Sequence, residues 1–112
     1  MLEQAEHELL PRLADLATQT NHSFNQAYAK RLTSRWGSCD SKQNIILNVY
    51  LVQLPPELID YVIFHELAHT QHMNHSAQFW NHLAKYCPEY KALRKRLRSV
   101  DPKIYELNTL MA

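Results

Sequence analysis

The segment His65-Glu66-Leu67-Ala68-His69 decides how this chain of 112 residues is interpreted. It lies inside a stretch with helical spacing of apolar residues, where its two histidines are about 40° apart around the axis and one turn apart along it. Both imidazoles can therefore face one ion at the roughly 2.0–2.1 Å that zinc–nitrogen bonds require. Glu66 projects next to that position, where its carboxylate can accept a proton from water activated by zinc. The segment predicts a zinc site on a helix.

A tetrahedral site needs a third protein ligand, and two histidines compete for that position. His72 continues the helical face of His65 and His69, but three imidazoles in a row on one helix cannot surround a tetrahedral ion. His75 comes six residues after His69, so it reaches the ion only if the helix ends and the chain folds back. Asn74 tolerates a left-handed conformation and is the residue expected to make that turn. We favour His75 over His72.

Apolar spacing and helix breakers outline the rest of the chain around this helix. The first helix is expected over Leu2–Thr20, with Pro11 either kinking it or marking its start, and with Asn21 as the stop. The next elements are a strand over Asn25–Leu32, a turn-forming loop over 33–41, a strand over Asn44–Val52, a helix from Pro55-Pro56 to about His72, a helix capped by Ser76 that runs through Tyr86, and a helix from Pro88 that Asp101-Pro102 ends. This order predicts an α+β fold in which a small antiparallel sheet flanks the helix of the metal site, and further helices complete the cleft.

Composition is that of a compact single domain. Hydrophobic residues make up 46% and charged residues 21%, and the net charge of +1 excludes a strongly basic nucleic-acid-binding arm as the organising feature. With a single glycine, Gly37, glycine-built phosphate loops are nearly excluded. Five of the seven histidines fall between positions 65 and 82, so function is expected there. His82, the last of them, is expected to be an exposed helix residue, the alternative being a position behind the ligands.

Targeting signals are not evident in the sequence. The N-terminus lacks the basic-then-apolar layout of a secretory signal, and no stretch approaches the roughly 18 apolar residues of a membrane span. Two cysteines, Cys39 and Cys87, are too few for a disulfide scaffold. We therefore expect one domain over residues 1–112, located in the cytoplasm and without membrane contact.

The loop over 33–41 contains two residues of functional interest. Gly37 is expected to supply a positive φ in a turn while Trp36 packs on the core. The alternative places the adjoining strand at the edge of the cleft, where an extended peptide can pair with it. Cys39 is expected to be a spare thiol, and its alternative role is an inhibitory thiol directed at the zinc.

The last two helices supply aromatic and basic residues near the metal site. Phe79 and Trp80 are expected to pack behind the metal. Tyr86 or Tyr90 is a candidate hydrogen-bond donor to the oxyanion of a hydrolytic intermediate. Five positive charges over Lys91–Arg98 are typical of a solvated helix face, and contact with nucleic acid is the alternative.

Several motifs together carry a resemblance to a known family. His65–His69 with His75-Ser76 and Phe79-Trp80, preceded by Arg35–Cys39 and Asn44–Asn48, resembles the YgjP-like zinc metallopeptidase domain, a relative of the WLM and SprT-type proteases. The resemblance covers roughly Leu10 to Arg98. It implies a zincin-like fold, zinc as the metal, peptide-bond hydrolysis, and the roles of ligand for His65, His69 and His75 and of general base for Glu66. Members of this family usually carry a further, β-rich N-terminal region, so we expect a short form or an excised catalytic domain.

These observations predict a zinc-dependent metallopeptidase that acts on peptide or protein substrates. Two other classes of function remain open. One is a non-catalytic, metal-stabilised interaction domain or DNA-associated domain, which would unfold on chelation without showing protease activity. The other is a metal-dependent nucleotide phosphohydrolase, which is disfavoured because magnesium sites prefer carboxylates and phosphates to three imidazoles.

Overall fold

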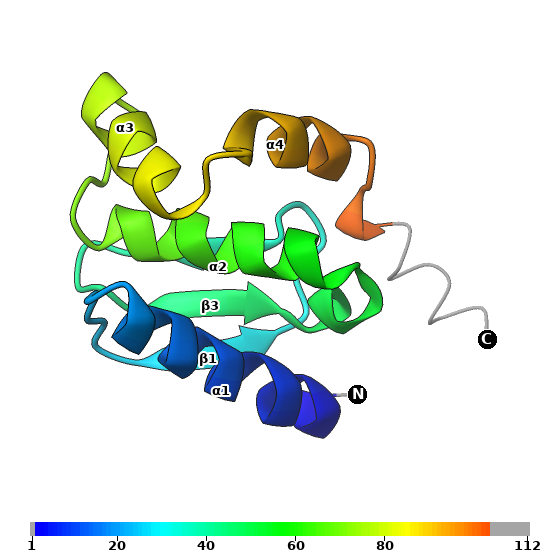
Figure 1. The fold of residues 1–112 in the computed structure, drawn as a ribbon. Coiled ribbons are helices and arrows are strands. Elements are labelled where there is room, and N and C mark those ends of the chain that lie inside the picture. Colours follow the sequence, from blue (N-terminus) through cyan, green and yellow to red (C-terminus); the bar gives the residue numbers. More distant parts are fainter. Residues whose placement is uncertain (1, 104–112) are drawn as a thin grey trace.

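The structure, a computed structural model, describes residues 2–103 (Figure 1). Its elements in chain order are α1 (Leu2–Gln19), β1 (Ala27–Lys30), β2 (Gly37–Cys39), β3 (Ile45–Asn48), the 3₁₀-helix η1 (Val49–Gln53), α2 (Pro56–His69), α3 (Ala77–Tyr86) and α4 (Tyr90–Arg98). The predicted α+β class and all four predicted helices are confirmed. None of the helices in the described residues has the length and apolar character that crossing a membrane requires.

The first helix buries one apolar face and ends where the sequence indicated. Helix α1 runs without interruption through Pro11, which is exposed, so this proline neither starts the helix nor divides it. Asn21 adopts a φ of 57°, and the amide of His22 donates to the carbonyl of Ala17 at 2.9 Å. This is the left-handed C-terminal arrangement that satisfies the last carbonyls of a helix. The buried face consists of Ala5, Leu9, Leu13, Leu16 and Ala17.

The sheet is mixed, so the prediction of a small antiparallel sheet holds for the pairing of β2 with β3 and is wrong for the pairing of β1 with β3. The strand order is β1-β3-β2, with β1 parallel and β2 antiparallel to the central strand β3. The reason lies in the predicted loop over 33–41, which contains β2. Because the chain reverses once on entering β2 and again on leaving it, β3 runs in the same direction as β1. Strand β2 is left at one edge of the sheet.

Asn48 explains why β3 is shorter than the predicted strand over Asn44–Val52. Its side chain is fully buried, and its Oδ1 accepts from the amide of Tyr50 at 3.1 Å, which caps η1. Its Nδ2 donates to the carbonyls of Leu32 at 2.8 Å and Arg35 at 2.9 Å. One amide side chain therefore ends β3, starts the following 3₁₀-helix and holds the loop that leads into β2.

Helix α2 lies between the sheet and the pair α3 and α4 (Figure 1). It is buried on more than one side, as its apolar sequence predicts. Arg12 of α1 donates two hydrogen bonds to the carboxylate of Asp60, at 2.9 and 2.6 Å, and so joins α1 to α2. Ser76 caps α3 by accepting from the amide of Phe79, which confirms its predicted role. The layers thus bury most of α2, and His65, Glu66 and His69 of its HExxH segment line a cavity.

A chain of hydrogen bonds through His22 joins the end of α1 to α3. The hydroxyl of Thr20 donates to the carbonyl of Leu16 at 2.7 Å and lies 2.6 Å from Nδ1 of His22. The hydroxyl therefore accepts from Nδ1–H, and Nε2 of His22 accepts from Nε2–H of His82 at 2.7 Å. His82 is half-buried in this pair, so the prediction that it is exposed is wrong.

Acidification is expected to destabilise the fold through this pair. Burial, with a smaller contribution from His82, lowers the pKa of His22 from its usual value of 6.5. The unfolded chain therefore binds more protons than the folded chain below about pH 6.5. As the pH falls below that value, the free energy of unfolding decreases, by at most about 1.4 kcal/mol per pH unit for one proton. We expect the free energy of unfolding, measured by urea titration, to fall less between pH 7 and 5 for His22→Gln than for the parent. His7→Gln, at an exposed position of α1, should show the same fall as the parent.

Candidate metal centre

Three imidazoles meet at the C-terminal end of α2. Nε2 of His75 lies 3.1 Å from Nε2 of His69 and 3.2 Å from Nε2 of His65. Two nitrogens bound to one zinc ion at a tetrahedral angle would be about 3.3 Å apart, so the observed spacing is close to that of a ligand set. His65, His69 and His75 also form the one group of metal-ligating side chains found in the described residues with all ligand atoms close together.

The hydrogen bonds of two of these rings leave their inner nitrogens available to a metal. His69 donates from Nδ1 to the carbonyl of His72 at 3.0 Å, and Nδ1 of His65 lies 3.3 Å from Oε2 of Glu66. A proton on each Nδ1 leaves a lone pair on each Nε2, and such outer partners are typical of ligating histidines. Burial, followed by the neighbouring His65, lowers the pKa of His69 and of His75 and favours the neutral rings that metals bind. The lone pairs on Nε2 of His65 and His69 are therefore available to a cation.

Helix α2 ends at the second histidine of the motif, which lets His75 approach. The hydroxyl of Thr70 donates to the carbonyl of Leu67 at 2.6 Å, and the amides that follow make only short-range bonds. The chain then reverses without a positive φ at Asn74, so the predicted left-handed turn at that residue is wrong. The ring of His72 lies instead beside His82, with ring centroids 5.3 Å apart. The structure thus brings the ring of His75, and not that of His72, to His65 and His69.

Aromatic side chains of α3 support the histidines from behind, as predicted. Phe79 is fully buried and stacks on His69, with ring centroids 4.5 Å apart and planes 27° apart. Trp80 stacks on His75 at 5.5 Å and 21°, and Tyr90 also stacks on Trp80. This wall restricts the rotamers of two candidate ligands and so holds their nitrogens in place.

Glu66 is held against β2, where Gly37 makes room for it. The glutamate is only 4% exposed, and a Cβ placed on Gly37 would lie 3.2 Å from its Cγ and Oε2 and from Cγ1 of Val62. Gly37 has no positive φ, so the predicted reason for this glycine is wrong. The residue is needed for close approach of a strand to the carboxylate rather than for turn geometry.

Substituting Gly37 with alanine is expected to lower kcat more than it lowers metal content. The added methyl group would displace the carboxylate of Glu66 by a few tenths of an ångström or push β2 away from α2. Since a misplacement of 1 Å costs about 100-fold in rate, we expect kcat to fall by several-fold, up to about tenfold. The histidines are not in this contact and should still bind metal. Steady-state kinetics and metal analysis of Gly37→Ala, with Ser41→Ala in the next turn as control, separate the two effects. An unchanged kcat would contradict the stated role of Gly37.

Tyr61 is a site residue that the sequence analysis missed. It lies one turn before His65 on α2, is 3% exposed, and lines a cavity of about 250 Å³ together with His65 and Glu66. Burial raises its pKa to about 12, while Arg94 and Arg98 act in the opposite direction. Its spacing of four residues from His65 was the signal that could have identified it. The two predicted tyrosines lie elsewhere, since Tyr86 packs against His22 and His82 and Tyr90 stacks on Trp80.

Strand β2 forms one side of the metal cavity. A cavity of about 260 Å³ is lined by α2 and β2 side chains with His75 and Met73, and Cys39 is among them. Burial, with contributions from Glu66 and Asp40, raises the pKa of Cys39 to about 11. The thiol therefore stays protonated near neutral pH and faces the same cavity as the histidines.

Comparisons with known proteins support a peptidase. Residues 1–100 match the family model of the YgjP-like metallopeptidase domain. Comparison with curated proteins gives no significant match. Among solved structures, the metallopeptidase zymogen jannalysin of Methanocaldococcus jannaschii is 25% identical, with a TM-score of 0.68 over 82% of this chain and 95% of that one. The metallopeptidase zymogen abylysin of Pyrococcus abyssi is 22% identical, with a TM-score of 0.68 over 88% of this chain and 93% of that one.

The three histidines and the buried glutamate thus lie in a fold that known metallopeptidases share. Since the family model spans nearly all the residues that build this fold, the chain belongs to the YgjP-like metallopeptidase family and is a metal-dependent hydrolase of the peptidase class.

Proposed function

We propose that the protein hydrolyses peptide bonds with zinc held by His65, His69 and His75 and with Glu66 as the general base. The observation that carries this proposal is the convergence of three Nε2 atoms beside a buried carboxylate. Three neutral imidazoles are a donor set typical of zinc and unlike the oxygen-rich sites of magnesium or calcium. When bound, zinc would supply Lewis acidity that polarises the substrate carbonyl and makes water more acidic.

The chain's own residues perform the proton transfers. Glu66 takes a proton from the attacking water and later delivers it to the amine that leaves, so one carboxylate serves both halves of the reaction. Its low exposure and its contact with β2 keep the carboxylate in one position and away from bulk water. His65 orients the carboxylate through Nδ1.

Strand β2 offers a binding edge to an extended substrate. Within residues 2–103 it pairs with β3 on one side only, and its residues line the cavity of the metal centre. An extended peptide can add to such an edge through backbone hydrogen bonds, which favours unstructured segments over folded proteins. The sequence analysis gave this as the alternative role of the segment around Gly37, and we adopt it here.

Metal removal tests the proposed function. We expect the purified protein to cleave an unstructured protein substrate such as denatured casein, to lose that activity on dialysis against a chelator, and to regain it when one equivalent of zinc is added. A folded, zinc-containing protein without activity on any peptide library would instead favour the non-catalytic interaction domain. Release of phosphate products from nucleoside triphosphates, without peptide cleavage, would favour the phosphohydrolase.

A further inference from the structure

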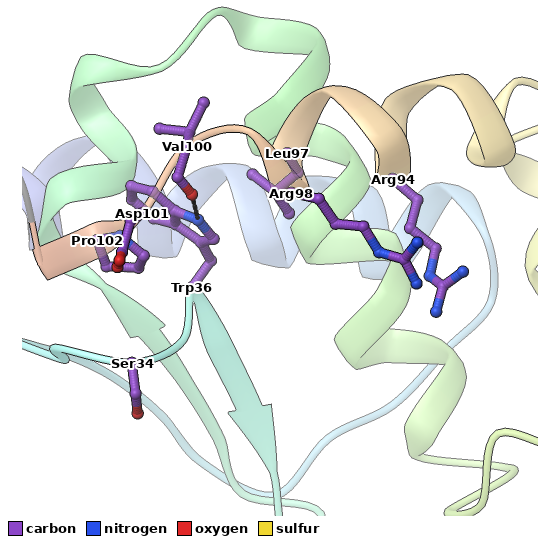
Figure 2. Close-up of a pocket in the computed structure, with 8 residues that line it drawn as sticks. All are labelled: Ser34, Trp36, Arg94, Leu97, Arg98, Val100, Asp101 and Pro102. Atoms are coloured by element: carbon purple, nitrogen blue, oxygen red, sulfur yellow. Dashed lines mark hydrogen bonds between the residues drawn. The ribbon is translucent and has the colours of Figure 1, made fainter.

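A third cavity continues the cleft away from the metal centre. Its volume is about 410 Å³, and it shares Trp36 and Leu97 with the cavity that contains Tyr61 and Glu66. That middle cavity in turn shares Arg35 and Gly37 with the metal cavity. An extended peptide bound in the cavity of the metal centre would have the outer cavity (Figure 2) next along the cleft.

The outer cavity is a built part of the fold rather than a gap beside a loose helix. The indole nitrogen of Trp36 donates to the carbonyl of Val100 at 3.2 Å and joins the start of β2 to the segment after α4 (Figure 2). Arg96, on the opposite side of α4, donates to the carboxylate of Glu57 at 3.1 Å and ties this helix to α2. The face of α4 that carries Arg94, Leu97 and Arg98 lines the cavity.

That face presents two guanidinium groups. Arg94 and Arg98 are one helical turn apart and both line the cavity, and Figure 2 shows their side chains extending from α4 in the same general direction. Within residues 2–103 neither takes part in an ion pair, although the guanidinium of Arg94 lies 5.0 Å above the Trp80 ring. Like charges that are held together repel, and an anion between them removes that cost.

The charge of the lining favours an anion over a cation. Asp101 also lines the cavity, but it lies at the Trp36 end, and its Oδ1 accepts from the amide of Lys103 at 3.0 Å. The remaining lining is apolar or small, from Trp36, Leu97, Val100 and Pro102, which suits a peptide side chain better than a chain of phosphates. Planar guanidinium groups recognise a carboxylate by paired hydrogen bonds.

We infer that Arg94 and Arg98 form a substrate subsite for a carboxylate, so that the protein selects peptides with an acidic group one cavity beyond the metal centre. This inference rests on the proposed function for its substrate class, since a peptide must occupy the cleft. The carboxylate comes either from an aspartate or glutamate side chain or from the C-terminus of the peptide, and binding measurements distinguish these sources.

The test measures binding and does not depend on turnover. Full-length, zinc-loaded Glu66→Gln protein is titrated with fluorescein-labelled peptides in which one glutamate, or glutamine as its match, is moved along an otherwise constant sequence. Each peptide is made with an amidated and with a free C-terminus. We expect glutamate at one position, or the free C-terminus alone, to tighten Kd by about tenfold, as a charge-assisted hydrogen bond predicts.

Arginine variants then assign the preference to the subsite. The readout is the ratio of the Kd of the neutral peptide to the Kd of the matched acidic peptide. The double variant Arg94→Gln/Arg98→Gln should bring this ratio close to one, and Arg94→Lys/Arg98→Lys should keep part of the preference. Lys95 is exposed on the same helix outside the cavity, so Lys95→Gln should leave the ratio unchanged. Thermal melts check that each variant is folded.

Three results would overturn the inference. The first is equal binding of acidic and neutral peptides at every position, and the second is a preference that survives Arg94→Gln/Arg98→Gln. The third is a single-stranded oligonucleotide that binds more tightly than the acidic peptide and displaces it, because the arginines would then be assigned to phosphate. Binding is measured in Glu66→Gln, which does not need to turn over the peptide. Absence of peptidase activity in the parent would therefore refute the proposed function and leave the test of the carboxylate subsite standing on the binding data.

Discussion

Replacing Glu66 with glutamine is expected to abolish peptide cleavage while zinc stays bound. Glutamine has the same shape and fits the space beside Gly37, but it cannot take a proton from water. Loss of a general base lowers kcat by about 10²–10⁴-fold. Zinc binding should persist, because Phe79 and Trp80 stack on His69 and His75. The amide oxygen of glutamine can still accept from Nδ1 of His65 in place of the carboxylate. Single-turnover kinetics with a fluorogenic peptide, alongside elemental analysis of zinc, measure both quantities.

Glu57→Gln is the matched control for this variant. Glu57 is an exposed acid in the first turn of the same helix and bonds to Arg96, so its substitution removes one carboxylate from α2 outside the cleft. We expect its kcat to equal that of the parent. A Glu66→Gln protein that cleaves peptides as fast as the parent would remove Glu66 from the mechanism.

The second large effect is expected at His75. Substituting it with alanine removes one of three converging nitrogens, and we expect zinc affinity to fall by more than about 100-fold, since loss of outer-shell partners alone costs 10–100-fold. His72→Ala should retain zinc, because the contact of His72 with the site is made by its backbone carbonyl and its ring lies beside His82. Competition with a chromogenic chelator measures both affinities.

The pair of histidine variants separates the two ligand choices cleanly. The positions are three residues apart in one short loop, so a general disturbance of that loop would affect both alike. Zinc release by His72→Ala together with zinc retention by His75→Ala would show that the loop adopts another arrangement in the metal-loaded protein and that His72 is the third ligand.

Local patterns account for what was predicted well. Each helix could be predicted from apolar spacing and from residues at its ends, such as Asn21 and Ser76, because helix contacts are short in sequence. The histidines lie within one helix and the loop that follows it, so their meeting also needed only local geometry.

Contacts between distant segments account for what was missed. The end of β3 depends on the hydrogen bonds of the Asn48 side chain to Leu32 and Arg35, which no spacing rule contains. Strand β2 has the sequence Gly-Ser-Cys, a poor strand former, and exists because it pairs with β3 and packs on α2. The role of Gly37 likewise appears only once Glu66 lies beside it.

The short length of β2 has a consequence for solubility. An unpaired strand edge that accepts substrate backbones also accepts the edge of another copy, which is the first step toward fibrils. A strand of three residues offers few backbone hydrogen bonds to another copy of the protein. Arg94 and Arg98 along the same cleft would also repel the same arginines of that copy. We therefore expect this edge to bind extended peptides transiently and to be a poor template for aggregation.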